Sequence, residues 1–112
     1  MLNIKINNMS SKVFKLTEKQ VLDRFEKAFA DSKFSDEKSD YYCGITDDLD
    51  RRAKEHNVDG YCLTMNLITF EAARDIEQKL SSLGFDCGDQ LGNGNEKSVY
   101  VYMCYKKAGF KK

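Results

Sequence analysis

The chain has 112 residues, the size of one ordinary domain, and its 18 basic side chains balance 18 acidic ones. With 41% hydrophobic and 32% charged residues, the composition is typical of a soluble globular protein and excludes a disordered or fibrous chain. Because the net charge is zero, no general electrostatic attraction to nucleic acid is expected. Any binding to nucleic acid must come from a local gathering of Lys and Arg.

The hydrophobic runs are short, so we expect neither a membrane-spanning helix nor a secretory leader. The four cysteines are widely spaced, and no two of them resemble half of a zinc site. An even number of cysteines permits disulfides. Three of the four nevertheless lie in strand-like runs, which favours reduced core thiols in a cytoplasmic protein.

The first expected element is a helix over residues 17–30. Thr17 and Gln20 fit a capping box, in which each side chain satisfies a free backbone amide at the start of a helix. Apolar residues then recur on one face from Val21 to Phe29. This helix is therefore expected to pack against other parts of the chain.

Three strands and two further helices are expected after a polar loop. The strands are expected over residues 41–45, 61–66 and 99–105, and the helices over 48–56 and 70–83. Thr46 or Asp47 is expected to cap the helix 48–56, Asn57 to stop it, and Thr69 to cap the helix 70–83. On the first strand, Tyr41, Cys43 and Ile45 are expected on one face, with Tyr42 and Gly44 on the other.

These elements predict a single α+β domain over residues 1–112, with a small mixed three-stranded sheet flanked by helices. Residues 1–39 form an N-terminal extension that carries the first helix, and residues 40–105 form the core. The glycine-rich segment 85–98 is expected to be a long loop. Residues 106–112 are expected to be a basic, frayed tail.

Four polar side chains are expected to gather near the end of the first strand. Arg52 and His56 are four residues apart, so they project from the same face of their helix. Tyr42 lies on the strand that leads into this helix. Glu77 falls inside or at the margin of the apolar stripe of the last helix, and an inward-facing carboxylate needs a metal ion, Arg52 or water as a partner.

The string YYCGITDDLDRRAKEHN (residues 41–57) resembles the second half of the GIY-YIG nuclease motif, with Tyr42-Cys43-Gly44 standing for Tyr-Ile-Gly. The string EAARDIEQKL (residues 71–80) resembles the later helix of that family, which places Glu77 at the position of its metal-binding glutamate. In all, the resemblance covers residues 40–84.

The resemblance implies a GIY-YIG-like fold that hydrolyses phosphodiester bonds of nucleic acid, with DNA favoured over RNA, using a single Mg²⁺ or Mn²⁺ ion. It implies that Glu77 holds the metal ion, that Arg52 neutralises charge on the phosphoryl group, and that Tyr42 and His56 position or deprotonate the attacking water. The expected activity is that of an endonuclease.

The chain departs from the family pattern in one respect, because no Gly-Ile-Tyr strand precedes the first tyrosine, Tyr41. Two alternatives remain open. The strand 99–105 supplies the lost phenol through Tyr100, Tyr102 or Tyr105, or nothing replaces it. In the second case the chain is an impaired nuclease that binds nucleic acid or a protein partner.

Each candidate residue also has an ordinary structural explanation. Arg52 can pair with Asp48 one turn earlier, and His56 can complement the carbonyl end of its helix. Glu77 can pair with Arg74 on the surface. The spacing that brings all the candidates together favours a functional site over these separate explanations.

Overall fold

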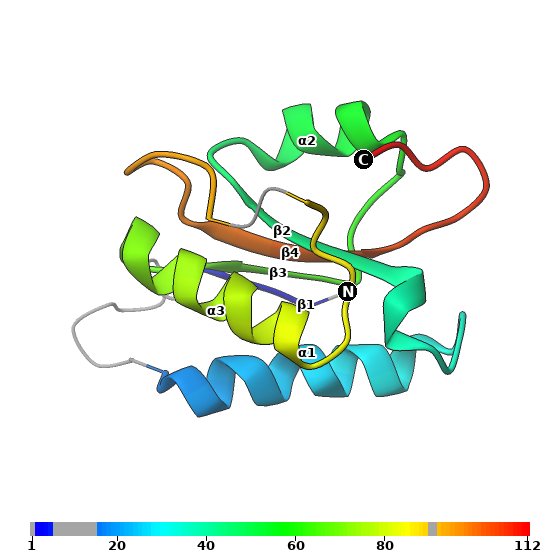
Figure 1. Cartoon of the computed structure of the whole chain (residues 1–112), viewed down its shortest axis with the longest axis horizontal. Helices are drawn as coiled ribbons and strands as arrows, with labels where there is room; N and C mark the ends of the chain where they lie inside the picture. The colour runs from blue at the N-terminus through cyan, green and yellow to red at the C-terminus, as the bar shows by residue number, and fades with distance from the viewer. Residues whose placement is uncertain (1, 6–15, 90–91) are drawn as a thin grey trace.

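The structure is a computed structural model that describes residues 2–5, 16–89 and 92–112, and it has an α+β fold (Figure 1). Its strands are β1 (Leu2–Lys5), β2 (Tyr41–Thr46), β3 (Leu63–Asn66) and β4 (Tyr100–Tyr105). Its helices are α1 (Glu18–Ser32), α2 (Leu49–His56) and α3 (Phe70–Ser82), with a short 3₁₀ turn at Lys38–Asp40. Within the described part of the chain, no helix combines the length and the hydrophobicity needed to cross a bilayer.

The strands form one mixed sheet in the order β1-β3-β4-β2. The three antiparallel strands β3, β4 and β2 are those expected from the sequence. β1 adds a fourth strand, parallel to β3, that the sequence did not predict. Four residues give too short a pattern to indicate a strand, and this one is defined by its pairing with a distant segment.

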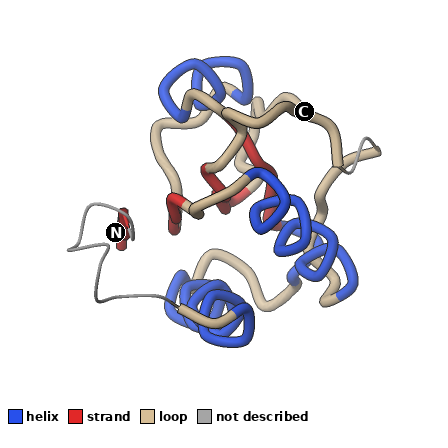
Figure 2. Tube along the Cα trace, turned by 90° about the vertical axis from the view of Figure 1, so that its left-hand side faces the viewer, coloured by secondary structure: helices blue, strands red, loops and turns tan. Residues whose placement is uncertain are grey.

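The two faces of the sheet are covered by different helices. α1 and α3 lie on one face and α2 lies on the other, as Figures 1 and 2 both show. The predicted alternation along β2 is confirmed, because Tyr41, Cys43 and Ile45 pack in the core with α1 and α3. Tyr42 packs with Tyr102 in a second, smaller cluster on the face covered by α2. The sheet therefore presents the phenols of Tyr42 and Tyr102 to the helix that carries Arg52 and His56.

The predicted N-terminal caps of α1 and α3 are confirmed. The Thr17 hydroxyl accepts a hydrogen bond from the Gln20 backbone N–H (3.1 Å), and the Thr17 N–H donates to the Gln20 side chain (2.8 Å), which completes the capping box. The Thr69 hydroxyl accepts from the Ala72 N–H and caps α3. These caps satisfy backbone N–H groups of the first turn, which have no carbonyl partner within the helix.

The cap of α2 differs from the prediction. Asp48 is the cap, since its Oδ1 accepts from the Arg51 N–H at 3.0 Å, whereas Thr46 still belongs to β2 and Asp47 lies in the turn. The Thr46 hydroxyl instead accepts from the Asp48 N–H at 3.1 Å and so holds the turn that leads into the helix. As predicted, α2 ends at Asn57, which adopts a left-handed conformation (φ 59°).

The expectation that residues 106–112 are frayed is wrong. This segment turns back from β4 and ends beside α2 (Figure 1). The Lys106 N–H donates to the Asp40 carbonyl, and the Lys111 N–H donates to the His56 carbonyl, both at 2.9 Å. Phe110 packs against the smaller apolar cluster. These contacts join distant segments, so the local composition of the tail did not reveal them.

All four cysteines are free thiols. Cys43, Cys87 and Cys104 are buried and Cys62 is partly exposed. Burial raises the pKa of Cys87 and of Cys104 to about 12, so both are protonated at neutral pH.

Candidate active site

A polar hollow of about 370 Å³ lies where β2, β4, α2, α3 and the loop after α3 meet. Three of the four residues predicted from the sequence line it, namely Tyr42, Arg52 and Glu77. The fourth, His56, is fully buried and contacts the rings of Tyr42 and Tyr102. The structure therefore brings the four predicted residues to one place.

Tyr102 supplies a second phenol to this cluster. Its hydroxyl lies 2.8 Å from Nε2 of His56, and both side chains are almost completely buried. β4 runs antiparallel beside β2, in a register that places Tyr102 opposite Gly44. Of the three candidate tyrosines, Tyr100, Tyr102 and Tyr105, it is Tyr102 that lines the hollow. The structure thus agrees with the first alternative, in which the strand 99–105 brings a phenol to the site.

Gly44 makes room for the hydroxyl of Tyr102. A Cβ atom at position 44 would lie 2.5 Å from that oxygen and 2.8 Å from the adjacent ring carbon. Carbon atoms do not approach so closely without a shift of one of the groups. The absence of a side chain at Gly44 therefore allows Tyr102 to reach across β2 toward α2.

Arg52 lines the wall of the hollow, and its side chain is about one-quarter exposed. Its Nη1 donates to Glu55 Oε1 at 2.9 Å, and its guanidinium faces the hydroxyls of Tyr42 and Tyr102. The suggested pair with Asp48 is replaced by the pair with Glu55. A permanent cation beside two hydroxyls can bind a phosphate oxygen.

Arg51 has a different role from its neighbour. It is more exposed than Arg52, and its ion pairs join Asp47 at 2.7 Å and Glu55 at 3.4 Å. It does not line the hollow that holds Glu77. The two adjacent arginines therefore form a natural comparison, one directed into the site and one bound to surface acids.

Both phenols of the site are held in the neutral form. Burial raises the pKa of Tyr42, and the Arg52 cation opposes this effect without cancelling it. Burial also raises the pKa of Tyr102, again against the opposing effect of Arg52. At neutral pH each hydroxyl can therefore donate one hydrogen bond and accept another.

His56 is also neutral at physiological pH. Burial lowers its pKa, the hydrogen bond to the Lys111 carbonyl raises it by a smaller amount, and the Arg52 cation lowers it further. Nδ1 of the ring lies 2.6 Å from the Lys111 carbonyl oxygen, which can only accept. Nδ1 therefore carries the proton, and Nε2 is left to accept the hydrogen bond from Tyr102.

Glu77 is the buried acid of the site, with 5% of its surface exposed. Its Oε1 accepts a hydrogen bond from the Gly92 backbone N–H at 3.0 Å. Burial raises its pKa, and the Gly92 amide partly offsets the rise. The suggested surface pair with Arg74 does not form, because Arg74 lies over the Phe70 ring instead. The carboxylate is thus directed into the hollow.

The residues described by the structure contain no group of three or more His, Cys, Asp and Glu side chains that could hold a metal ion. A cation at this site would therefore draw on the two carboxylates that line the hollow, Glu77 and Asp89, together with water and substrate oxygens. Mg²⁺ accepts such an arrangement, since it keeps several waters and commonly takes one or two carboxylates plus phosphate. The donor set fits a weakly held Mg²⁺ or Mn²⁺ ion.

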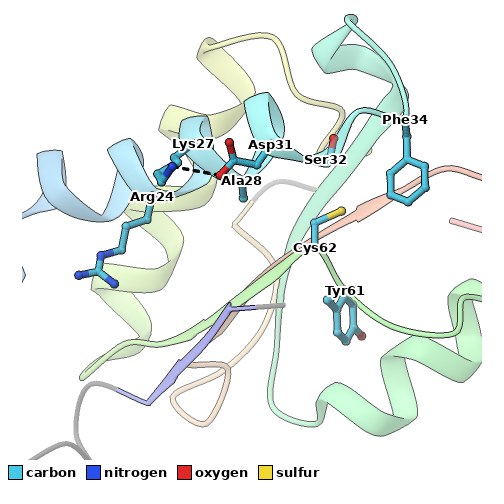
Figure 3. A pocket seen from close by; sticks show the side chains of 8 residues that line it. All are labelled: Arg24, Lys27, Ala28, Asp31, Ser32, Phe34, Tyr61 and Cys62. Atoms are coloured by element: carbon cyan, nitrogen blue, oxygen red, sulfur yellow. Dashed lines mark hydrogen bonds and ion pairs between the residues drawn. The ribbon is translucent and has the colours of Figure 1, made fainter.

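A second hollow, of about 480 Å³, lies beside α1 and contains none of the predicted residues (Figure 3). Its lining is mainly apolar and includes Phe34, Tyr61 and Cys62. Lys27 at its rim is paired with Asp31 at 3.1 Å. The groups needed for proton transfer and phosphate binding are gathered in the first hollow.

Other residues that line the first hollow are not among the four predicted site residues, and they include Asp89, Asn93 and Lys112. Asn93 is in a glycine-rich loop, where asparagine is common for reasons of turn geometry. Lys112 reaches the site only because the segment 106–112 folds back, and its Nζ pairs with Asp86 at 3.0 Å. No local sequence signal indicated that fold-back.

Comparisons of the chain with protein-family models, with curated proteins and with solved structures find no significant match. The function is therefore inferred from the residues of the site and their geometry.

Proposed function

We propose that this chain is a metal-dependent nuclease of the GIY-YIG type that hydrolyses phosphodiester bonds in DNA. The hydrogen bond between Tyr102 and His56 carries the proposal, because it places a proton acceptor behind a hydroxyl that lines a polar hollow. Arg52 and Glu77 in the same hollow supply a cation and an acid. The likeness of residues 40–84 to the nuclease motif supports the same conclusion.

The proton path begins at the hydroxyl of Tyr102. In the proposed reaction, the oxygen of water bonds to phosphorus while its proton passes to the Tyr102 oxygen. Tyr102 gives its own proton to Nε2 of neutral His56, and the bond from phosphorus to the leaving oxygen breaks. The leaving oxygen departs as an alkoxide that takes a proton from solvent, Tyr102 ends unchanged and His56 ends as a cation, so protons and charge balance. A positioned acceptor of this kind contributes roughly 10²–10⁴-fold in rate.

Arg52 and Tyr42 bind the phosphate in this scheme. The guanidinium is always charged and offers two N–H groups in a plane, which suits the oxygens of a phosphodiester. Its pair with Glu55 holds it at the wall of the hollow. Tyr42, which is neutral and lines the hollow, donates a hydrogen bond that orients the phosphate or the water.

Glu77 would hold the divalent cation. The chemistry that Mg²⁺ or Mn²⁺ supplies when bound is the polarisation of a phosphate oxygen. The neighbouring Cys87 is a poor competitor as a ligand, because Mg²⁺ and Mn²⁺ prefer oxygen to sulfur ligands. The Gly92 N–H donates to one carboxylate oxygen, Oε1, and so holds the carboxylate of Glu77 in place.

The test is cleavage of plasmid DNA, single-stranded DNA and RNA by the purified chain in Mg²⁺ and in Mn²⁺. We expect cleavage of DNA, and its loss in Tyr102→Phe, which keeps the ring and removes the hydroxyl. Tyr105→Phe is the matched control, because Tyr105 stacks on Phe34, away from the hollow. Absence of cleavage with every substrate and both metals contradicts the proposal and favours a binding module for nucleic acid or a protein partner.

A further inference from the structure

The segment 107–112, here called the strap, packs against His56 and Tyr42 of the site. The Lys107 ammonium pairs with Asp59 at 2.9 Å, and the Asn57 side chain donates to the Gly109 carbonyl at 3.2 Å. The Phe110 N–H donates to the Lys107 carbonyl and closes a turn. These contacts bring the last part of the strap against His56.

Two residues of the strap contact the imidazole of His56 directly. The ring of Phe110 stacks on it with centroids 4.9 Å apart and an interplanar angle of 14°. Phe110 also packs against Tyr42, at 5.4 Å. Lys111 makes a pair of hydrogen bonds with His56: its N–H donates to the His56 carbonyl at 2.9 Å, and its carbonyl lies 2.6 Å from Nδ1.

The bond to the Lys111 carbonyl decides which ring nitrogen holds the proton. A carbonyl oxygen accepts only, so the neutral ring must carry its hydrogen on Nδ1. In the other tautomer, Nδ1 and the carbonyl would oppose two lone pairs, and Nε2–H would donate to the hydroxyl of Tyr102. That tautomer cannot take a proton from Tyr102.

We propose that the strap is a positioning element of the active site: the Lys111 carbonyl fixes the tautomer of His56, and the Phe110 ring holds the imidazole in line with the hydroxyl of Tyr102. The catalytic use of this arrangement rests on the proposed nuclease function. Its effect on His56 does not, and can be measured separately. Phe110 and Lys111 thus act through His56, without contact to the substrate.

The test is ¹⁵N NMR of the imidazole at a pH where the ring is neutral. His56 is the single histidine of the chain, so its two ring nitrogens need no assignment by mutation. The native protein is expected to show a protonated Nδ1 and an unprotonated Nε2. A native spectrum with the proton on Nε2 overturns the proposal.

Two variants at position 111 separate the backbone from the side chain. Lys111→Ala keeps both backbone hydrogen bonds and is expected to leave the tautomer unchanged. Lys111→Pro removes the N–H that anchors the strap to the His56 carbonyl, and it is expected to give a mixture of tautomers. Phe110→Ala is expected to do the same by releasing the ring, with Phe110→Leu restoring part of the single-tautomer signal.

Cleavage kinetics give the second readout. In Lys111→Pro and Phe110→Ala we expect kcat to fall about tenfold or more with a smaller change in KM, as part of the roughly 10²–10⁴-fold contribution of a positioned proton acceptor. An unchanged tautomer in both variants overturns the proposal even if activity falls. If the native chain cleaves nothing, the proposed function fails, while the spectra alone decide whether the strap positions His56.

Discussion

The hydroxyl of Tyr102 and Nε2 of His56 lie 2.8 Å apart, although 46 positions separate the two residues in the sequence. One residue stands on the strand β4 and the other at the last turn of α2. The bond is buried, and its direction is set by the proton on Nδ1 of the ring. The two residues are therefore expected to function as a unit.

That coupling predicts non-additive kinetics. We expect Tyr102→Phe and His56→Gln each to lower kcat by about 10² or more, and the double variant to lose little beyond the more damaging single change. The measurement is a double-mutant cycle on kcat, with folding of each variant checked by circular dichroism. Effects that multiply would show that the two residues act independently and would contradict the proton path.

Arg52 and Arg51 provide a comparison between adjacent positions. Arg52→Ala removes the cation at the wall of the hollow, and we expect a loss of about 10²–10³ in kcat/KM, as for other groups that stabilise charge in a transition state. Arg51→Ala breaks exposed ion pairs with Asp47 and Glu55 and a 3.3 Å hydrogen bond to the Thr46 hydroxyl, none of which lies in the hollow, so we expect a change below about threefold. Equal losses would mean that the wrong face of α2 has been assigned to the site.

Gly44→Ala tests the close packing of Tyr102 on β2. The new methyl group would lie 2.5 Å from the Tyr102 hydroxyl oxygen, which must move away from His56. We expect destabilisation of about 1–3 kcal/mol, measured by urea unfolding, and a marked fall in cleavage. Gly60→Ala is the control, because a Cβ there meets no atom within 4 Å. Full activity in Gly44→Ala would indicate that the position of Tyr102 is not critical.

The pH dependence of cleavage is expected to follow the titration of His56. Its pKa is lowered from 6.5 by burial, the Lys111 carbonyl and Glu55 oppose the fall, and Arg52 reinforces it, with the neutral hydroxyl of Tyr102 facing the ring. As the pH falls through this lowered pKa, Nε2 takes up a proton and can no longer accept from Tyr102. The acid limb of kcat should therefore lie below pH 6.5 and match the NMR titration of the histidine.

The lowered pKa of His56 also predicts how the stability of the fold depends on pH. The unfolded chain takes up a proton on His56 near pH 6.5, before the folded chain does. The contribution of His56 to stability is thus fully present above that pH and is lost as the pH falls toward the folded pKa. Urea unfolding at pH 8 and pH 5 measures the loss. A midpoint that rises on acidification in Glu77→Gln, where the opposing effect of the raised Glu77 pKa is removed, would contradict a lowered pKa of His56.

Features that depend on a few neighbouring residues could be predicted from the sequence. The capping box at Thr17, the cap at Thr69 and the stop at Asn57 depend on a few adjacent residues, and the structure confirms them. The inward position of Glu77 followed from the period of its helix and is also confirmed. Spacing along a strand and its following helix likewise placed Tyr42, Arg52 and His56 together.

Features that depend on distant pairing could not be predicted in the same way. Three tyrosines on the last strand were equally good candidates from sequence, and only the register of β4 against β2 selects Tyr102. The strap had the composition of a frayed tail, yet its backbone bonds with His56 hold it in place. Both outcomes follow from contacts between segments far apart in the chain.

The most direct measurement is metal-dependent DNA cleavage by the native chain beside Glu77→Gln and Glu71→Gln. The two changes are chemically identical and lie on the same helix, but Glu77 is buried in the hollow whereas Glu71 is exposed. We predict cleavage that requires Mg²⁺ or Mn²⁺, a loss of about 10² or more in Glu77→Gln, and native activity in Glu71→Gln. Cleavage that persists in Glu77→Gln, or in a chelator with no added metal, would contradict a metal-dependent active site at this position.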